Sequence, residues 1–145
     1  MVKEMNEIEM LNYIYQNSKI GIINIDNIKG EIKNKNLQKS LKTQQNNYFE
    51  ICNEATDLLF SAGKEREEVS SITKVMTYID SRINTMNDNS LKNIIKLLIN
   101  KNTERIIDLE NRIKEYKGNN KKVKSLCKKL LILEKNNLEK NKKYL

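Results

Sequence analysis

Polar side chains interrupt otherwise apolar helical rows in this sequence, and they have the clearest potential for chemistry. Apolar residues recur at every third or fourth position along most of the chain, and hydroxyl, amide and phenol groups occupy some places in these rows. Such groups can hydrogen-bond across helices, and a buried polar residue fixes helix register in coiled coils at some cost in stability. The spacing therefore predicts a buried polar layer formed by Ser18, Gln44, Tyr48, Asn102 and Asn137.

Nucleophilic catalysis lacks its usual partners in this chain. The sequence has no histidine, so it contains no Ser–His or Cys–His pair. No glycine-rich phosphate loop follows a strand, and the acidic pair Glu67–Glu68 lies in a charged linker, where carboxylates are typically solvated. The two cysteines, Cys52 and Cys127, form no Cys-x-x-Cys motif, and we expect both to be reduced, half-buried packing residues. These features favour a protein without enzymatic activity.

Positive charge is concentrated at the C-terminal end. Residues 1–116 carry 17 Lys and Arg against 17 Asp and Glu, whereas residues 117–145 carry 10 Lys against 2 Glu. A helix in this segment would present a basic face to phosphates or anionic lipid. Because the segment has no Arg and no exposed aromatic residue, its contact with a nucleic acid would be nonspecific and salt-sensitive. The alternative is a solvated face that suits the helix dipole. The candidate anion-binding residues are Lys121, Lys124, Lys128 and Lys135.

Length and composition indicate a single helical domain over residues 1–145. The sequence has no proline and four glycines, which removes the usual breaks of helices. Charged residues make up 32% of the chain and interrupt every apolar segment, so we expect no membrane span. The first residues are partly acidic and lack the apolar core of a signal peptide, which predicts a cytoplasmic protein.

Periodicity and capping residues set the expected helices. Gly63 follows the second apolar row in the position of a C-terminal glycine cap. Ser70 or Ser71, and then Ser90, are plausible N-caps for the two helices that follow. The predicted helices cover residues 3–29, 34–62, 70–87, 90–117 and 120–144 approximately.

Two rows define the expected core-facing sides of the last two helices. For residues 90–117 the row is Leu91, Ile95, Leu98, Asn102, Ile106, Leu109, Ile113 and Tyr116. For residues 120–144 it is Val123, Leu126, Leu130, Leu133, Asn137, Lys140 and Tyr144. Both rows combine steps of three and four residues, as one face of an α-helix does.

The lengths of the breaks favour an antiparallel four-helix bundle. The first two and the last two long helices are separated by only a few residues, so each pair should be antiparallel neighbours. The segment between residues 62 and 90 is long enough to travel the length of the bundle, with the shorter helix 70–87 as a crossover. This is the ferritin-like arrangement, and a simple up-and-down bundle of five helices is the alternative.

Several helical patterns resemble small, mostly uncharacterised bacterial proteins of the ferritin-like superfamily. The resemblance would cover nearly the whole chain and implies the same fold. In that fold Cys52 and Cys127 would lie at similar heights on neighbouring helices. A disulfide between the two cysteines is then an alternative to simple packing. The patterns are Leu11-Asn12-Tyr13-Ile14-Tyr15, Gln45-x-x-Tyr48-x-x-Ile51 with Glu54-Ala55 and Leu58-Leu59, Gly63, Glu134-x-x-Asn137 and Lys143-Tyr144-Leu145.

The di-iron chemistry that this resemblance implies lacks its ligands here. Ferritin-like sites need Glu residues and two Glu-x-x-His motifs. The corresponding places in this chain read Glu50-Ile-Cys-Asn53 and Glu134-Lys-Asn-Asn137, with Asn where the imidazole belongs. We therefore expect no cofactor and no metal; an unusual carboxylate site would have to use Glu50, Glu104 and Glu134.

Three functions remain open from the sequence. The first is a noncatalytic structural or interaction module with a degenerate ferritin-like core, which binds an unknown protein or dimerises through an exposed apolar stripe such as Ile23, Ile99 and Ile107. The second is a ferritin-like metal-binding or redox protein. The third is nonspecific nucleic-acid binding through the basic C-terminal helix.

Overall fold

Four long helices make up most of the chain in a computed structural model that describes residues 5–70 and 91–145. They are α1 (Glu7–Ile28), α2 (Lys35–Ser61), α5 (Leu91–Glu115) and α6 (Lys121–Lys142), and a short 3-10 turn, η1 (Lys29–Glu31), follows α1. The described part contains no strand, only an isolated bridge between Met5 and Tyr116. These helices confirm the all-α prediction; the helix expected at 70–87 falls on positions outside the described residues, Ser70 excepted.

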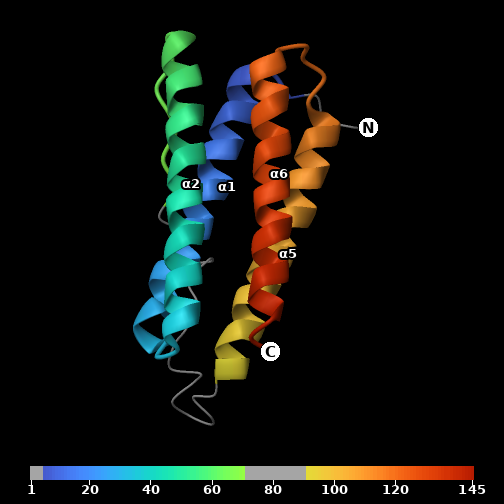
Figure 1. Cartoon of the computed structure of the whole chain (residues 1–145). Helices are drawn as coiled ribbons and strands as arrows, with labels where there is room; N and C mark the ends of the chain where they lie inside the picture. Colours follow the sequence, from blue (N-terminus) through green and yellow to red (C-terminus); the bar gives the residue numbers. More distant parts are fainter. Residues whose placement is uncertain (1–4, 71–90) are drawn as a thin grey trace.

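The four helices lie lengthwise beside one another, as Figure 1 shows. Helix α1 contacts α2, α5 and α6, and α2 also contacts α6. The turn between α1 and α2 and the start of α5 lie at the lower end of Figure 1, whereas the end of α2 and the turn between α5 and α6 lie at the upper end. One core of buried apolar residues runs between the helices, with Ile14, Leu59, Leu98 and Leu130 at 0–1% exposure. None of the described helices is long and apolar enough to cross a membrane.

Helix ends are fixed by asparagine caps and one glycine. Asn6, Asn34 and Asn120 each precede a helix and accept hydrogen bonds from backbone N–H groups of its first turn. Gly63 adopts φ +70°, and the Lys64 N–H donates to the Leu59 carbonyl at 2.9 Å, which closes the end of α2. The predicted glycine cap is therefore confirmed, whereas the asparagine caps were hidden by the abundance of asparagine in the sequence.

Replacing the α6 cap gives a direct test of local stability. The Asn120 Oδ1 accepts from the N–H groups of Lys122 at 2.9 Å and Val123 at 3.2 Å. Asn120→Ala leaves both donors without this partner, and we expect it to lower the free energy of unfolding by about 1 kcal/mol. Asn120→Ser loses the same 3.3 Å bond from the Asn120 amide to Glu7 as the alanine variant but keeps a capping oxygen, so it should retain most of the wild-type stability in the same urea titration. Equal losses in both variants would contradict the capping role.

Candidate functional site

The centre of the bundle holds a buried ionic group made of Tyr48, Arg105 and Glu134. Arg105 Nε lies 3.3 Å from Glu134 Oε1, and the Tyr48 hydroxyl donates to Glu134 Oε2 at 2.9 Å. Arg105 Nη2 also donates to the Tyr48 hydroxyl oxygen at 3.2 Å. Tyr48 and Glu134 are fully buried and Arg105 is 7% exposed. One residue each from α2, α5 and α6 thus meets in a closed hydrogen-bonded group, which we call the core triad.

Glycine on α1 makes room for the phenol ring of the core triad. A Cβ atom at Gly21 would lie 2.8 Å from the Cε2 and Cζ atoms of Tyr48, which is closer than side-chain carbons pack. Gly21 is itself buried within α1. The absence of a side chain therefore lets the Tyr48 ring lie against the α1 backbone, and all four helices contribute to the position of the triad.

Burial and neighbouring charge keep the Tyr48 phenol protonated and the Arg105 guanidinium charged. Burial raises the pKa of the Tyr48 phenol well above its ordinary value, and the nearby Glu134 carboxylate raises it further. Burial alone would lower the pKa of the Arg105 guanidinium, but Glu134 and Tyr48 outweigh this effect and the pKa rises. Tyr48 therefore keeps its proton and Arg105 its charge around neutral pH. Neither group has the near-neutral pKa that suits an acid–base catalyst.

A second buried polar cluster lies beside the triad and also joins three helices. The Gln44 amide of α2 donates to Asn141 Oδ1 of α6 at 2.8 Å, and Asn141 Nδ2 donates to Asn102 Oδ1 of α5 at 2.9 Å. All three residues are at most 1% exposed. We call this the amide cluster. Its bonds fix the relative heights of α2, α5 and α6, because each amide must face its partner to be satisfied.

The residues expected in one polar layer are all buried, but they are divided between separate contacts. Tyr48 belongs to the core triad, and Gln44 and Asn102 belong to the amide cluster. Ser18 and Asn137 are both fully buried. The Ser18 hydroxyl and both polar atoms of the Asn137 amide have no hydrogen-bond partner among the described residues. Asn137 nevertheless lies close to the core triad, because its amide opposes the rise in the pKa of the Tyr48 phenol.

Arg105, Glu134 and Asn141 are core residues that the sequence rows missed. The rows passed through Leu133 and Lys140, but Leu133 is only partly buried and Lys140 is exposed, whereas Glu134 and Asn141 are fully buried. A signal was present, because the steps Asn102, Arg105, Leu109 and Leu130, Glu134, Asn137, Asn141 alternate between three and four without a slip. The prediction missed this pattern because it preferred leucine to charged residues at core positions.

The three carboxylates named as a candidate metal set do not come together. Glu50 is exposed on α2, and Glu104 is exposed on α5, where it pairs with Lys101 at 3.5 Å. Glu134 is buried and bound to Arg105 and Tyr48. Across residues 5–70 and 91–145, no three His, Cys, Asp or Glu side chains are grouped in a way that could hold a metal ion.

The linker after α2 is held against α1 rather than solvated throughout. The Glu67 N–H donates to Asn12 Oδ1 at 2.7 Å, and the Tyr15 hydroxyl donates to Glu68 Oε2 at 2.7 Å. Arg66 also pairs with Glu68 at 2.9 Å. The hydrogen bond from Tyr15, followed by that from Arg66, lowers the pKa of the Glu68 carboxyl below its ordinary value. Glu67 and Glu68 are both exposed, as expected for solvated carboxylates, but these contacts hold the linker that carries them against α1.

Both cysteines are free thiols and more deeply buried than expected. Cys52 and Cys127 are each 4% exposed, and burial raises the pKa of each thiol to about 11. Because the thiolate is the reactive form, we expect both to react with a disulfide reagent at pH 8 at least about tenfold more slowly in the folded protein than in urea. The measurement is absorbance of the released thiolate. Fast labelling of either cysteine in the folded protein would contradict the burial.

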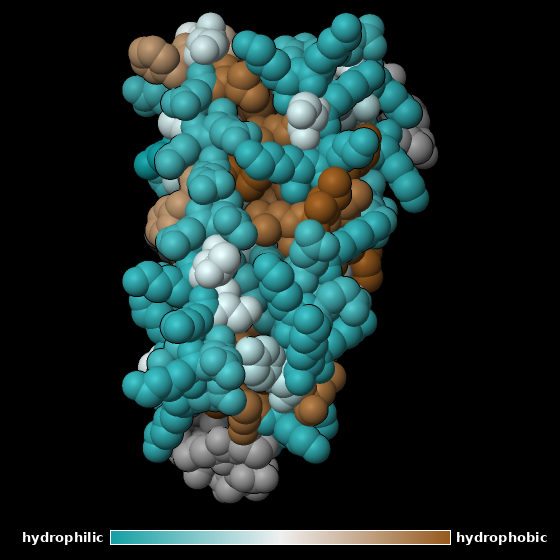
Figure 2. All heavy atoms as spheres, viewed as in Figure 1, coloured by the Kyte–Doolittle hydropathy of each residue, from teal (hydrophilic) through white to brown (hydrophobic). Residues whose placement is uncertain are grey.

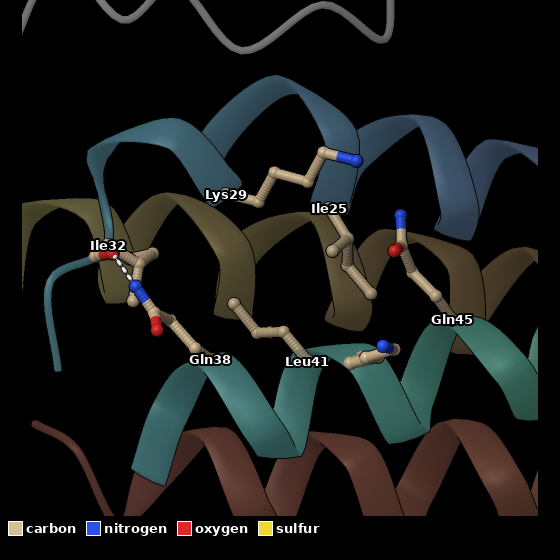
Figure 3. Close-up of a pocket in the computed structure, with 7 residues that line it drawn as sticks. Ile25, Lys29, Ile32, Gln38, Leu41 and Gln45 are labelled. Carbon is tan, nitrogen blue, oxygen red and sulfur yellow. Dashed lines mark hydrogen bonds between the residues drawn. The ribbon is translucent and has the colours of Figure 1, made fainter. Parts of the chain in front are cut away.

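Most polar groups around the surface hollow between α1 and α2 are already hydrogen-bonded or ion-paired. Figure 3 shows this hollow, which measures about 370 Å³ and lies near the turn that connects the two helices. Its floor includes Ile25 and Leu41, and at its edge the Gln38 amide donates to the Ile32 carbonyl at 2.6 Å. Lys29 at the rim pairs with Asp26 at 2.9 Å. The hollow is therefore shallow, with much of its polar rim already bonded.

The candidate anion-binding lysines all lie on the surface of α6. Lys121, Lys124 and Lys128 are exposed on its N-terminal half and have no acidic partner among the described residues. Lys135 is exposed but lies 3.6 Å from Glu110 of α5. The structure thus separates three unpaired lysines from a fourth that is partly neutralised.

Comparison with protein-family models, curated proteins and solved structures found no match for this chain.

Proposed function

We propose that this protein is a noncatalytic helical-bundle interaction module that associates with a second copy of itself through the outer face of α2. The observation that carries the proposal is the exposure of two aromatic rings there, Phe60 at 80% and Phe49 at 45%. The core supports a noncatalytic role, because the members of its triad bond to one another, with Tyr48 protonated and Arg105 charged. The polar chemistry of the core then serves to fix the helices.

The proposed architecture is an antiparallel bundle in ferritin-like order. Short connections join α1 to α2 and α5 to α6, which favours antiparallel pairs. The end of α2 and the start of α5 lie at opposite ends of the bundle in Figure 1. The connection from α2 to α5 therefore joins opposite ends of the bundle, which is the order of a ferritin-like bundle. The resemblance in helical patterns and the buried core triad in place of metal ligands together support a degenerate ferritin-like core.

The outer face of α2 carries two exposed aromatic rings with charged side chains at its edges, because Lys19 lies over the Phe49 ring at 5.9 Å and Arg66 donates to Thr56 at 3.4 Å. Phe49 and Phe60 are about three helical turns apart on one side, and the residues between them on that side, Asn53 and Thr56, are uncharged. Aromatic enrichment and charge depletion distinguish interface centres from other surface. By contrast, the expected stripe on Ile23, Ile99 and Ile107 offers little, because Ile23 and Ile99 are partly buried. Figure 2 shows a mostly hydrophilic face with a brown, apolar area in its upper half.

Phe60 also borders a hollow on the same face, which makes the surface self-complementary. The hollow measures about 390 Å³ and is lined by Thr56, Phe60, Lys64, Glu65, Arg66 and Glu68. In a two-fold pair, each copy presents the same knob and the same hollow to its partner. Phe60 of each copy can then enter the hollow of the other, and burying both rings supplies the apolar contact that this exposed helix lacks.

Sedimentation velocity over a range of protein concentrations tests this function. We expect the wild-type protein to shift from monomer to dimer as concentration rises, and F49S/F60S to remain monomeric. The matched control is I107S/I132S, which removes two exposed apolar side chains from α5 and α6. Ile107 is 55% exposed and Ile132 is 51% exposed, and their loss should leave the dimer intact. Circular dichroism checks that each variant is folded. A wild-type protein that stays monomeric throughout, or equal losses in both double variants, would overturn the proposal.

A further inference from the structure

We propose that the N-terminal half of α6 binds the sugar–phosphate backbone of a nucleic-acid duplex without sequence preference. The binding surface is a row of three exposed lysines, Lys121, Lys124 and Lys128, which we call the basic row. This inference is independent of self-association, because it concerns a different helix and a different kind of partner.

Helical geometry places the basic row on one side of α6. Steps of three and four residues keep the three side chains within one narrow arc, about 4.5–6 Å apart along the axis. Lys122 is exposed next to this arc, and Lys117 is exposed in the turn just before the helix. The result is a line of point charges on a straight, rigid support, which suits a regular row of phosphates.

No member of the basic row forms an ion pair within the described structure, although Glu54 and Asp57 line the same hollow as Lys121. The acidic residues that pair with lysines of α6 contact lysines outside the basic row: Glu54 pairs with Lys129, Glu110 with Lys135 and Glu139 with Lys142. The chain as a whole carries a formal net charge of +8, and its excess lies in residues 117–145. Phosphates that replace counterions at unpaired lysines gain affinity through counterion release.

The apolar side of α6 argues for a nucleic-acid backbone over a membrane. Val123, Leu126 and Leu130 are 0–3% exposed in the core, so they are not available to enter a bilayer as the apolar face of a membrane-surface helix does. The basic row has neither arginine for bidentate contacts to bases nor an aromatic side chain for stacking. Lysine ammonium groups without such neighbours contact phosphates rather than read bases.

Fluorescence anisotropy with a short mixed-sequence DNA duplex tests the proposal. We expect binding at about 50 mM NaCl that weakens steeply toward about 200 mM, with the same affinity for a second, unrelated sequence. In K121Q/K124Q/K128Q the affinity should fall about tenfold or more, and the slope of log affinity against log salt should become shallower by about 0.9 for each phosphate that the variant no longer neutralises.

The matched control removes the same charge with similar spacing from another helix. Lys35, Lys39 and Lys42 are exposed at the start of α2, so K35Q/K39Q/K42Q lowers the net charge equally without touching α6. It should change the affinity less than about threefold. Equal losses in both triple variants, no duplex binding at low salt, or strong preference for one sequence would overturn the proposal. So would binding to phosphatidylglycerol vesicles without binding to DNA.

Discussion

Replacing Arg105 with methionine should lower the free energy of unfolding by about 3–5 kcal/mol, the largest effect we expect from a single substitution. The change leaves the Glu134 carboxylate fully buried without its positive partner, with the Tyr48 hydroxyl as its remaining donor in the core triad. A buried charge that loses its counter-charge must either stay poorly solvated or gain a proton. Both states cost free energy relative to the wild-type pair. Glu134→Leu should cost a similar amount, because it leaves the buried guanidinium of Arg105 without the carboxylate that balances its charge.

The double variant R105M/E134L separates the pair from its individual charges. Removing both charges in favour of apolar side chains of similar size is often neutral or stabilising, so we expect it to recover most of the stability. Urea titration followed by circular dichroism gives the three unfolding free energies, and the interaction energy follows from the cycle. Additive losses, with the double variant least stable of all, would mean that Arg105 and Glu134 are not coupled as the 3.3 Å contact between them indicates.

Adding one methyl group at Gly21 should destabilise the protein, although alanine favours helices over glycine. The new Cβ would lie 2.8 Å from two carbons of the fully buried Tyr48 ring, which has no free space to move into. Overpacking of this kind costs about 1–3 kcal/mol, and the gain in helix propensity offsets up to about 1 kcal/mol of it. We therefore expect Gly21→Ala to lower the free energy of unfolding by up to about 2 kcal/mol in urea titration.

Gly30→Ala is the matched control for this prediction. A Cβ at Gly30 has nothing within 4 Å, and the residue lies in the exposed turn after α1 without a positive φ. Alanine there should be neutral or stabilising by up to about 1 kcal/mol, because it restricts the unfolded chain. The two substitutions add the same atom and are expected to have opposite signs. A stabilising Gly21→Ala would mean that the Tyr48 ring does not pack against α1 as the structure places it.

Sequence spacing alone determined the helices and where polar groups enter the core. The rows of apolar residues required amphipathic helices whatever their order, and the glycine cap at Gly63 followed from backbone geometry that few other residues adopt. The five polar positions expected in the core are all buried, because an interruption of a regular row still points the same way as the row. These properties depend on residues near one another in the chain.

Tertiary structure alone decided which charged residues the core contains. Glu134 lies next to Leu133 in sequence, and local preference places the leucine inside, yet the carboxylate is buried because Arg105 on α5 and Tyr48 on α2 supply its partners. Gly21 has no local reason to be small; the ring of Tyr48 from another helix requires it. A buried ion pair is stable only when both charges and their donors converge. Residues distant in sequence converge only when the helices pack, so spacing along one helix does not predict them.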